Sequence, residues 1–423
     1  MQLLFLHQNF PGQYRHLATA MGKRAGTKVV ALGQTDTPGL PGITQLRYRA
    51  PRPGKTTPHP YLVRTEGHIR HGQAAARAAL ELRAKGFRPD LICVHPGWGE
   101  GLFLRDVFPD AKMIFYWEYF FQSQGGDIGF DPPGVAPGLD EAARTRVQNT
   151  IQLIQLDAAD WGVSPTRWQW SRYPEWARSR MSVIHEGIDT AIASPRGCAA
   201  FKLPDGRTLT PEDEVATFAA RNLEPYRGFP QFMRALPAFQ RLRPRAHVVV
   251  VGGDGVSYGR APAQGGSWRE VMLRELNGRI DLSRVHFVGR VSYPQLLGLF
   301  RLTRAHLYLT YPFVLSWSML DAMACGAAIL GSATAPVQEV IQDGVNGRLV
   351  DFFNHEAIAE AFAAMLANPD AQASLKAAAR QHLVENYDLE AICLPRQIAM
   401  LDAVAAGQPG PVLAAQHHSC AFR

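Results

Sequence analysis

Two arginines stand close together in the segment AARNLEPYRGF, residues 219–229. Arg221 and Arg227 flank a turn and precede apolar residues at helical spacing, Phe229, Phe232, Met233, Leu236 and Phe239. Two guanidinium groups beside a helix N-terminus can hold a diphosphate, because forked N–H groups and the helix dipole both favour negative charge. The alternative is that both arginines are ordinary surface residues, and this segment alone does not decide between the two.

A single acid, Asp321, interrupts the apolar stretch at residues 310–330. The pattern from Ser316 to Ala324 predicts a buried helix, and a small-residue turn follows it at Cys325 and Gly326. One interpretation is that Asp321 and the amides at the start of this helix bind a charged, hydroxylated molecule. The other, which this stretch alone favours, is that Asp321 only caps the helix or faces solvent.

The apolar run VVVVGGDG, residues 248–255, ends in glycines. It lacks both GxGxxG and the lysine of a Walker A motif, so it indicates neither a Rossmann dinucleotide site nor a P-loop. Its glycines, Gly253 among them, predict instead that the backbone closely approaches a ligand.

Strand-like and helix-like runs alternate along the chain in two series. The first series begins with a strand at residues 3–8 and contains helices at residues 72–85 and 139–156. The second follows residues 189–216, which are rich in turn residues and mark a domain boundary. Alternation of this kind predicts parallel sheets covered on both faces, so two series predict two doubly wound α/β domains.

Ligands of open α/β sheets bind beyond the carboxyl ends of the strands. Polar or glycine-rich segments follow several predicted strands of both series: HQNFPGQ, VHPGWGEG, YWEYF, HEGID, ARNLEPYRG, VGGDGVSYG and GRVSY. Their joint placement on two domains predicts a site in a cleft.

The composition bounds the class of protein. Hydrophobic residues make up 46% of the 423, yet no run of about 18 apolar residues exists, so no membrane-spanning helix is expected. The N-terminus MQLLFLHQNF is expected to be a strand and not a signal peptide. Five scattered cysteines without a CxxC spacing argue against a disulfide framework or structural zinc and favour a reducing cytoplasm. The net charge of +7 favours anionic partners such as nucleotides, whereas no basic block is dense enough for a nucleic-acid arm.

The order of these motifs resembles the donor-binding half of the retaining glycosyltransferases of family four (glycosyl transferases group 1). The resemblance rests on the strand leading to Arg221, the basic residue and glycine at 227–228, and then VVVVGG, VHFVGRVSYPQL and MLDAMACGAAILGSATAPVQEVIQDGVNGRLVD. It extends more loosely over residues 1–405. It implies a GT-B fold, in which two Rossmann-like domains face each other across a cleft.

The resemblance also implies domain bounds. The N-terminal domain, on the acceptor side, is expected at residues 1–190, and the donor-side domain at residues 191–388. A C-terminal helix at 389–406 is expected to pack back on the N-terminal domain, and residues 407–423 are expected to form a flexible tail.

In this family a basic pair contacts the donor diphosphate, and Arg221 and Arg227 stand at those positions. The FVGRV segment usually lies around the nucleotide base, which implies roles for Phe287, Gly289 and Arg290. Backbone amides at the start of the following helix can face phosphate whatever their side chains are. These amides belong to Leu315, Ser316 and Trp317.

The family signature is a pair of glutamates, and the second one binds the ribose hydroxyls. Asp321 takes its place, and its shorter carboxylate can still accept two hydroxyl donors. The first glutamate falls at Phe313, which has no carboxylate. This departure from the family pattern bears on how the donor sugar is held and on which sugar is used.

In the N-terminal half, Gly12 stands where the family has a glycine loop near the diphosphate. Glu118 occupies the point where the family often has a histidine near the donor sugar, and we expect a site role for it over a structural one. His95 follows the preceding strand, with a hydrogen-bonded strand-end histidine as the alternative. His185 and Glu186 stand on the crossover into the second domain, where hinge or acceptor contacts are plausible.

These observations predict a cytoplasmic, retaining glycosyltransferase with Arg221, Arg227 and Glu118 as catalytic residues. It would use a nucleotide-diphosphate-sugar donor, with UDP- or GDP-sugar favoured, and no metal or other cofactor. The alternatives are a non-catalytic nucleotide-sugar-binding homologue and a phosphorylase or synthase on the same fold.

The acceptor would be a glycan, a lipid or a small molecule, and a peripheral contact with the inner membrane face is left open. The segment FYWEYFF and four tryptophans are either ordinary core aromatics, which is favoured, or an apolar acceptor groove. These tryptophans are Trp161, Trp168, Trp170 and Trp176.

Overall fold

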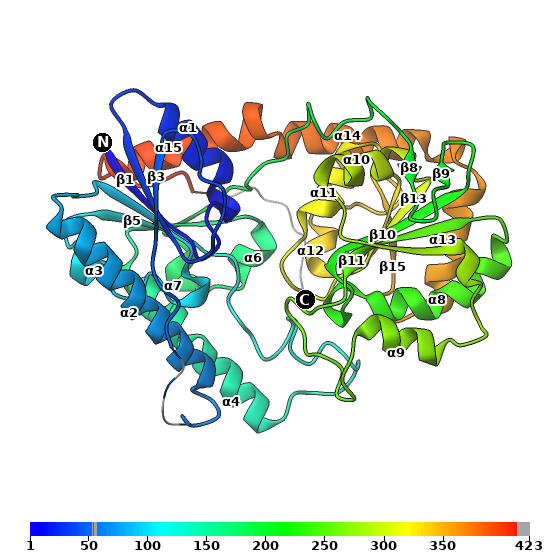
Figure 1. Cartoon of the computed structure of the whole chain (residues 1–423), viewed down its shortest axis with the longest axis horizontal. Helices are drawn as coiled ribbons and strands as arrows, with labels where there is room; N and C mark the ends of the chain where they lie inside the picture. The colour runs from blue at the N-terminus through cyan, green and yellow to red at the C-terminus, as the bar shows by residue number, and fades with distance from the viewer. Residues whose placement is uncertain (53, 55–56, 413–423) are drawn as a thin grey trace. The chain divides into compact units, whose positions relative to one another are not determined.

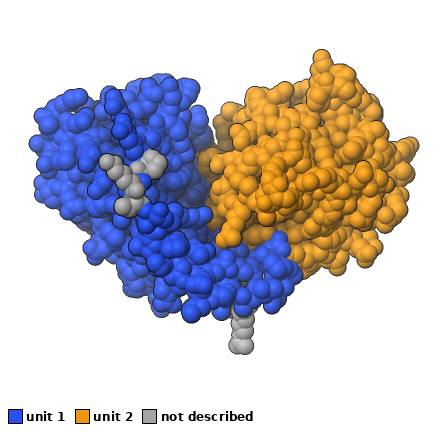
Figure 2. Space-filling model, turned by 60° about the horizontal axis from the view of Figure 1, so that its bottom comes forward, with its two compact units in different colours: residues 1–187, 390–423 blue, residues 188–389 orange. Residues whose placement is uncertain are grey.

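The computed structural model describes residues 1–52, 54 and 57–412 (Figure 1). The chain divides into two compact units, which Figure 2 draws in different colours. Unit 1 comprises Met1–Gly187 and the segment from Glu390 onward, and unit 2 comprises Ile188–Leu389. Unit 2 is therefore one uninterrupted stretch of chain, whereas unit 1 is closed by a returning C-terminal segment. Residues 413–423 of the expected tail lie outside the described residues.

Unit 1 contains a sheet of seven parallel strands in the order β3-β2-β1-β4-β5-β6-β7. Strands β1 and β4 are buried almost end to end, as expected of parallel strands covered on both faces. The strands are β1 Gln2–Leu6, β2 Lys28–Gly33, β3 Ile43–Arg47, β4 Leu91–Val94, β5 Lys112–Tyr116, β6 Trp161–Ser164 and β7 Met181–Val183.

The helices of unit 1 include one that starts earlier than its apolar pattern predicts. Helix α2 begins at Val63, whereas the apolar pattern predicts a start at Gly72. Its polar first turns carry an ion pair between Glu66 and Arg70 and no apolar stripe, so the apolar pattern does not indicate them. The helix predicted at 139–156 is two helices, since the Asn149 side chain at their junction exchanges hydrogen bonds with the backbone of Phe121. The helices are α1 Arg15–Lys23, α2 Val63–Ala84, α3 Leu104–Val107, α4 Leu139–Gln148, α5 Thr150–Ala158, α6 Arg167–Ser171, α7 Glu175–Arg178 and α15 Leu394–Ala405.

Helix α15 lies against α1 in unit 1 (Figure 1). Its Met400, Leu401 and Val404 belong to the same buried cluster as residues of β1 and α1. At its outer edge, Arg24 and Asp402 form an ion pair of 2.6 Å. The last segment of the chain thus completes the core of the first unit.

Unit 2 contains a sheet of six parallel strands in the order β12-β11-β10-β13-β14-β15, and a separate short hairpin, β8-β9. The strands are β8 Phe201–Lys202, β9 Thr208–Leu209, β10 Val215–Asn222, β11 His247–Gly253, β12 Val285–Gly289, β13 Ala305–Tyr308, β14 Ile329–Ser332 and β15 Arg348–Val350. The helices are α8 Phe229–Leu242, α9 Trp268–Glu275, α10 Tyr293–Leu302, α11 Trp317–Ala324, α12 Ala335–Gln338, α13 His355–Ala367 and α14 Ala373–Tyr387.

Both sheets are parallel and doubly wound, which confirms the predicted α/β class with two Rossmann-like domains. In each sheet the strand order reverses beside one strand, at β1/β4 in unit 1 and at β10/β13 in unit 2. Ligands of such sheets bind at the carboxyl ends of the strands that flank this switch point. Each unit therefore has one edge where site residues are expected.

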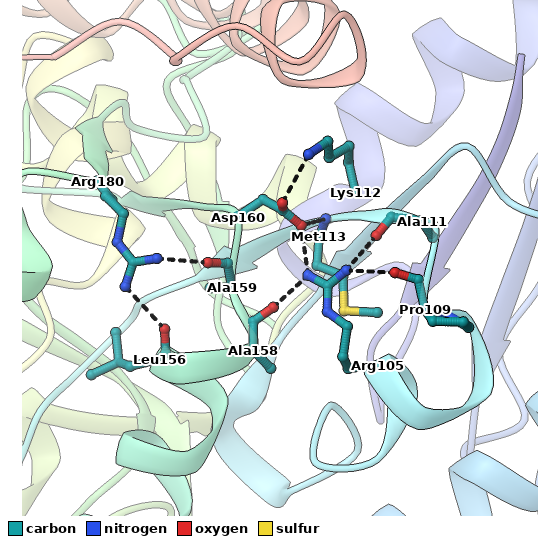
Figure 3. A network of polar contacts seen from close by, with 10 residues as sticks. All are labelled: Arg105, Pro109, Ala111, Lys112, Met113, Leu156, Ala158, Ala159, Asp160 and Arg180. Carbon is teal, nitrogen blue, oxygen red and sulfur yellow. Dashed lines mark hydrogen bonds and ion pairs between the residues drawn. The ribbon is translucent and has the colours of Figure 1, made fainter.

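The opposite, amino edge of the unit 1 sheet is held by a polar network (Figure 3). The Asp160 carboxylate accepts hydrogen bonds from the Arg105 guanidinium at 2.6 Å, the Lys112 ammonium at 3.1 Å and the Met113 backbone N–H at 2.9 Å. Arg180 donates to the carbonyls of Ala159 and Leu156 (Figure 3). This network joins the starts of strands β5, β6 and β7 and lies away from the expected site edge.

Candidate functional site

In unit 1 three side chains follow neighbouring strands at the carboxyl edge: His7 after β1, His95 after β4 and Glu118 after β5. His95 Nε2 lies 3.5 Å from Glu118 Oε2. Gln13 connects the other two, because its amide N–H donates to Glu118 Oε1 at 2.8 Å and its oxygen lies 2.8 Å from His7 Nε2. These four side chains are called the Glu118 cluster below.

The backbone sets the direction of these hydrogen bonds. Asn9 N–H donates to His7 Nδ1, and Gly97 N–H donates to His95 Nδ1. Each imidazole therefore carries its proton on Nε2, so that His7 donates to Gln13 and His95 directs its N–H at Glu118. The Glu118 carboxylate thus accepts a hydrogen bond from Gln13, which itself accepts one from His7, and it faces the Nε2–H of His95.

Electrostatics in the Glu118 cluster favour an ionised carboxylate. Burial by itself raises the pKa of Glu118, but hydrogen bonds from His95 and Gln13 and the nearby imidazoles outweigh it, and the pKa lies below its ordinary value. Burial, assisted by His95, lowers the pKa of His7 to about 3. At neutral pH the cluster therefore holds a charged Glu118, with 32% of its side chain exposed, beside a neutral His7.

Gly12 opens a short 3₁₀ turn, Gly12–Tyr14, directly beneath this cluster. Its φ is +45°, a conformation that favours glycine, and a side chain at this position would overlap the His7 ring from the Cβ atom onward. Gly12 thus lets the turn approach His7 and brings Gln13 within reach of Glu118.

His185 and Glu186 follow strand β7 at the end of unit 1, and Glu186 lines a small cavity together with Gln13 of the Glu118 cluster. His185 Nε2 lies 3.3 Å from Glu186 Oε2, and both side chains are buried. Burial lowers the pKa of His185 to about 3. Gln397, from helix α15, donates to the His185 carbonyl at 2.8 Å.

The four tryptophans are placed differently from one another. Trp161 and Trp168 are buried, and the Trp161 N–H donates to the Ser182 hydroxyl at 2.8 Å. The Trp170 N–H donates to the Arg178 carbonyl at 3.2 Å, whereas Trp176 is 56% exposed. Two of the four are thus core residues, and only Trp176 is widely open to solvent.

In unit 2, Arg227 ends a 3₁₀ turn, Pro225–Arg227, between β10 and α8. Its side chain is only 8% exposed and donates to the Thr310 hydroxyl at 2.7 Å, the Val314 carbonyl at 2.9 Å and the Tyr308 hydroxyl at 3.3 Å. All three acceptors are neutral, and within the described residues no carboxylate lies within 4 Å of the guanidinium. In this part of the chain Arg227 is thus a buried cation without an ion-pair partner, at the carboxyl edge of the sheet.

Arg221, near the end of β10, is exposed. The next residue, Asn222, accepts a hydrogen bond from Arg290 at 3.0 Å and donates to Ser257 at 2.8 Å. A Cβ on Gly253 would lie 2.8 Å from the Asn222 oxygen and 2.9 Å from Arg290 Nε, so glycine makes room for this contact. Arg290 and Gly253 are therefore brought together, although their sequence positions are far apart.

Asp321 lies on α11 and is 7% exposed, and the Tyr293 hydroxyl donates to its Oδ1 at 2.9 Å. Burial raises the pKa of Asp321 to about 7, against the opposing effect of that hydrogen bond. The side chain therefore lies close to half-ionised at neutral pH. Asp321 thus neither caps α11, whose N-cap residue is Ser316, nor faces solvent, which was the alternative that this stretch alone favoured.

The amides at the start of α11 are partly engaged. Ser316 is the N-cap residue, and its own N–H donates to the Tyr308 hydroxyl at 2.8 Å, while the Ser318 N–H donates to the Ser316 hydroxyl. Leu315 is buried and Trp317 is exposed. The Ser316 amide can therefore reach a phosphate only by exchanging its tyrosine partner.

Phe287 and Gly289 lie on β12. The Phe287 ring is half-buried, contacts Phe229 edge-on, and has the Arg269 guanidinium 5.6 Å from its centre. Gly289 has a φ of +66°, which turns the chain at the strand end. The segment suggested for base recognition is thus partly covered by Arg269 from α9.

Phe313, at the position of the absent glutamate, is buried in a group of aromatic rings. Its ring lies 5.3 Å from Tyr226 and 4.9 Å from Tyr258, and Tyr226 stacks on Tyr311 at 4.7 Å. The Arg227 guanidinium lies 5.3 Å from the centre of the Tyr258 ring. The cation is thus bounded by aromatic faces and hydroxyls on this side.

Sequence reasoning did not single out several of these residues: His7, Gln13, Asn222, Tyr258 and Tyr293. All five stand in the polar segments that follow predicted strands. That position was the available signal, and nothing in it indicated which side chain of each segment makes a contact.

Among the residues that the structure describes, no three His, Cys, Asp or Glu side chains are grouped so that they could hold a metal ion. No helix among the same residues is both long and apolar enough to cross a bilayer.

Two family models match the chain. Residues 25–193 match the model described as Glycosyl transferase family 4 group, and residues 205–382 match Glycosyl transferases group 1. The D-inositol 3-phosphate glycosyltransferase of Mycolicibacterium smegmatis is 26% identical over 229 residues, which are 52% of this chain and 45% of that protein. Its counterpart in Kribbella flavida is 26% identical over 48% of this chain and 47% of that protein. The chain thus spans about half the length of the curated relatives it matches.

Solved structures agree in fold. The sucrose-phosphate synthase of Thermosynechococcus elongatus superposes with a TM-score of 0.68 at 19% identity, over 96% of this chain and 100% of that one. The Anabaena protein HepE, in complex with UDP, superposes with a TM-score of 0.65 at 14% identity, over 96% and 100%. At these identities the likeness concerns the fold alone.

Proposed function

The chain belongs to the glycosyltransferases of family four, with the GT-B fold, and on this premise we propose that it transfers a sugar from a nucleotide-diphosphate donor to an acceptor hydroxyl with retention of anomeric configuration. UDP- and GDP-sugars are the favoured donors. The HepE structures with UDP and with UDP-glucose support a donor of this class. The acceptor is a hydroxyl of a glycan, a lipid or a small molecule.

The observation that carries this proposal is the buried Arg227. A guanidinium that is 8% exposed and whose hydrogen bonds to Thr310, Val314 and Tyr308 go to neutral oxygens has lost most of its hydration without forming an ion pair among the described residues. An anion that approaches such a group gains more than it would at a surface arginine. A diphosphate is such an anion. Arg221, which is exposed near the end of β10, adds a second positive charge.

Asp321 is proposed to bind the ribose hydroxyls. Its carboxylate is buried and has one phenol donor, Tyr293, so an oxygen remains for a hydroxyl group. Gly253, Phe287, Gly289 and Arg290 are proposed to surround the base. The amides of Leu315, Ser316 and Trp317 are proposed phosphate contacts, with that of Ser316 conditional on release from Tyr308.

The proposed reaction breaks the bond between the anomeric carbon and the diphosphate oxygen, and the electron pair leaves with the nucleoside diphosphate. The acceptor oxygen forms the new bond on the same face of the sugar, and its proton passes to the departing phosphate. Arg227 and Arg221 stabilise the charge that develops on this phosphate. The steps balance without an oxidant, a reductant or a metal.

Glu118 is proposed to stabilise charge and not to act as a general base. Its lowered pKa makes it a weak proton acceptor, whereas an ionised carboxylate can accept a hydrogen bond from the reacting hydroxyl and stabilise positive charge on the sugar. Gly12, Gln13 and His95 hold it in place. His185 and Glu186 contact each other, and the hinge or acceptor role expected for them at the crossover stays a proposal.

The test has two stages. Thermal shift with UDP, GDP, ADP and dTDP identifies the nucleotide, because a bound ligand stabilises the fold by mass action. The matching UDP- or GDP-sugar is then incubated with the full chain, with and without EDTA, and the released sugar and its anomeric configuration are followed by NMR. Retained configuration and EDTA resistance are expected, and an inverted product or a lost activity restored by Mg²⁺ would contradict the proposal.

A non-catalytic nucleotide-sugar-binding protein is the second candidate. Phe313 favours it, because a buried aromatic ring stands where a carboxylate for the donor sugar is expected from the family pattern. Such a protein binds the nucleotide in the first stage and releases no sugar in the second. The same two measurements therefore separate the candidates.

A further inference from the structure

A pocket of about 280 Å³ lies within unit 1, beside the Glu118 cluster. Helices α2, α4 and α5 and the turn Pro96–Trp98 supply its walls. The lining side chains that matter here are Arg64, His68, Trp98, Phe121, Gln148 and Gln152. None of them has a role in the site described above.

We propose that this pocket binds the acceptor, and that the acceptor is a polyhydroxylated ring bearing an anionic group, a carboxylate or a phosphate. The inference rests on the proposed transferase function and specifies its substrate class. The volume is close to that of pockets that hold one small molecule and is too small for a long glycan to be enclosed.

The amides in the pocket suit hydroxyl groups. Gln152 is only 8% exposed, and its N–H donates to the Tyr119 carbonyl at 2.8 Å. Its oxygen is buried and has no hydrogen-bond partner in the described part of the chain. A buried amide oxygen of this kind is costly unless a donor satisfies it, and a sugar hydroxyl provides one. Gln148, half-buried beside it, can donate and accept in the same way.

Trp98 supplies an apolar face for the ring itself. The indole is half-buried, and its ring stacks on the His95 imidazole with centroids 4.7 Å apart. His95 in turn directs its Nε2 at Glu118. The His95 imidazole thus connects the Trp98 ring with Glu118, the carboxylate proposed to accept a hydrogen bond from the reacting hydroxyl.

The charge of the pocket comes from Arg64. It is exposed on α2, and no acidic residue is among the lining side chains. His68 adds no charge at neutral pH, because burial and the nearby Arg64 lower its pKa to about 4. Within the residues that the structure describes, Arg64 makes no ion pair, so it is available to a carboxylate or phosphate at the pocket mouth.

The experiment measures binding of glucose, glucuronate and glucose 6-phosphate to the full chain by calorimetry. We expect both anionic rings to bind more tightly than glucose, by about tenfold for one charge-assisted contact. Arg64→Gln should abolish this preference and leave glucose binding unchanged. Trp98→Leu and Gln148→Ala should each weaken all three rings. Arg77→Gln, an exposed arginine on the same helix outside the pocket, is the matched control and should change nothing.

The comparison of glucuronate with glucose 6-phosphate tells which anion the pocket prefers. The proposal is overturned if no ring binds the wild-type chain, if glucose binds as tightly as the anions, or if Arg64→Gln has no more effect than Arg77→Gln. UDP binding to the same variants is measured in parallel and should be unaffected. If none of UDP, GDP, ADP and dTDP binds the wild-type chain, the proposed function is contradicted, whereas intact nucleotide binding with an unselective pocket contradicts only the acceptor inference.

Discussion

Arg227 and Asp321 are both buried ionisable side chains in unit 2, and burial acts on them in opposite ways. Burial alone would lower the pKa of Arg227, but nearby tyrosines and Glu224 outweigh it, so the guanidinium stays charged. Among the residues that the structure describes, Asp321 has the Tyr293 phenol as a donor and forms no ion pair, so burial raises its pKa to about 7. One side chain therefore offers a fixed charge to a ligand, and the other offers a charge that depends on pH.

Arg227→Met should lower the affinity for UDP at least about tenfold, because a charge-assisted contact to the diphosphate is lost. The ligand-free protein should stay folded, since the methionine fills much of the volume and no buried cation remains. Calorimetric titration with UDP and a thermal melt without ligand measure the two effects. Arg241→Met, at an exposed position on α8, is the control. Equal UDP affinity in both variants would remove Arg227 from the site.

Asp321→Asn should stabilise the ligand-free fold above neutral pH. The folded pKa of about 7 lies above the ordinary value of 3.8, so the stability linked to this group is complete below pH 3.8 and is lost as pH rises through 7. At pH 8 the variant should gain about 2–4 kcal/mol in free energy of unfolding relative to wild type. Urea unfolding at acidic and alkaline pH measures this difference.

The same substitution should weaken nucleotide binding by about 1.5–3 kcal/mol, because a charged acceptor becomes a neutral amide. Asp321→Ala should weaken it further. A variant that is more stable and binds UDP as tightly as wild type would leave Asp321 a buried acid without a ligand role.

Glu118→Gln tests the charge of the Glu118 cluster. It should lower turnover about 10²-fold at neutral pH, as the loss of an electrostatic stabiliser does. Gln13→Leu should be milder and should shift the acid limb of the pH–rate profile to higher pH, because a donor that lowers the Glu118 pKa is gone. Glu81→Gln, exposed on α2, controls for loss of one negative charge. An unmoved acid limb in Gln13→Leu would show that the Gln13 contact does not tune Glu118.

At the scale of elements, the two edges of the unit 1 sheet differ in their polar contacts. The carboxyl edge collects polar side chains whose hydrogen bonds are directed at one carboxylate, Glu118. At the amino edge, Asp160 receives a guanidinium, an ammonium and a backbone N–H within one network (Figure 3). One edge thus carries the residues of the proposed site, and the other fixes the starts of the strands.

Asp160→Ala should destabilise unit 1 by about 1.5–3 kcal/mol at neutral pH, because hydrogen bonds to a charged group are lost. Burial would raise the pKa of Asp160, but Arg105, Lys112 and the Met113 N–H lower it overall. The stability that ionised Asp160 contributes is therefore present above pH 3.8, its ordinary pKa, and is lost as pH falls through its lower pKa in the folded protein. Urea unfolding at neutral and acidic pH should show a smaller difference between wild type and variant in acid. Asp157→Ala, exposed on α5, should match wild type at both.

At the scale of the whole molecule, the two units differ in how the chain builds them. Ile188–Leu389 is a single stretch, whereas unit 1 needs α15 from the far end of the sequence. Met400, Leu401 and Val404 are almost fully buried in its core. The stability of unit 1 therefore depends on a segment that lies beyond unit 2 in the chain.

Ending the chain after Leu389 should destabilise unit 1 by about 5 kcal/mol or more, since each buried apolar side chain contributes about 1.5–3 kcal/mol. This is comparable with the stability of an ordinary domain, so unit 1 should become sensitive to protease. Unit 2 should stay folded and bind UDP. Limited proteolysis with mass spectrometry, with and without UDP, measures both, and a protease-resistant unit 1 would contradict the role given to α15.

Much of the fold is readable from the sequence because its signals are local. Apolar runs bounded by glycines predict buried parallel strands, and runs such as Phe229–Phe239 predict one face of a helix. Two alternating series predict two parallel sheets, and the structure confirms them. The position of the site edge follows as well, since parallel strands end on the same side of a sheet. Arg221, Arg227 and Asp321 were proposed in this way, and their roles stay predictions.

The contacts within each site depend on the tertiary structure. Gln13 meets Glu118, and Tyr293 meets Asp321, only because the sheet order places their segments side by side. Strand periodicity specifies which residues are buried, but not which strands are neighbours or which rotamer each polar side chain adopts. The engagement of the Ser316 amide by Tyr308 and the pocket beside Trp98 arise in the same way, from packing between segments that no local pattern connects.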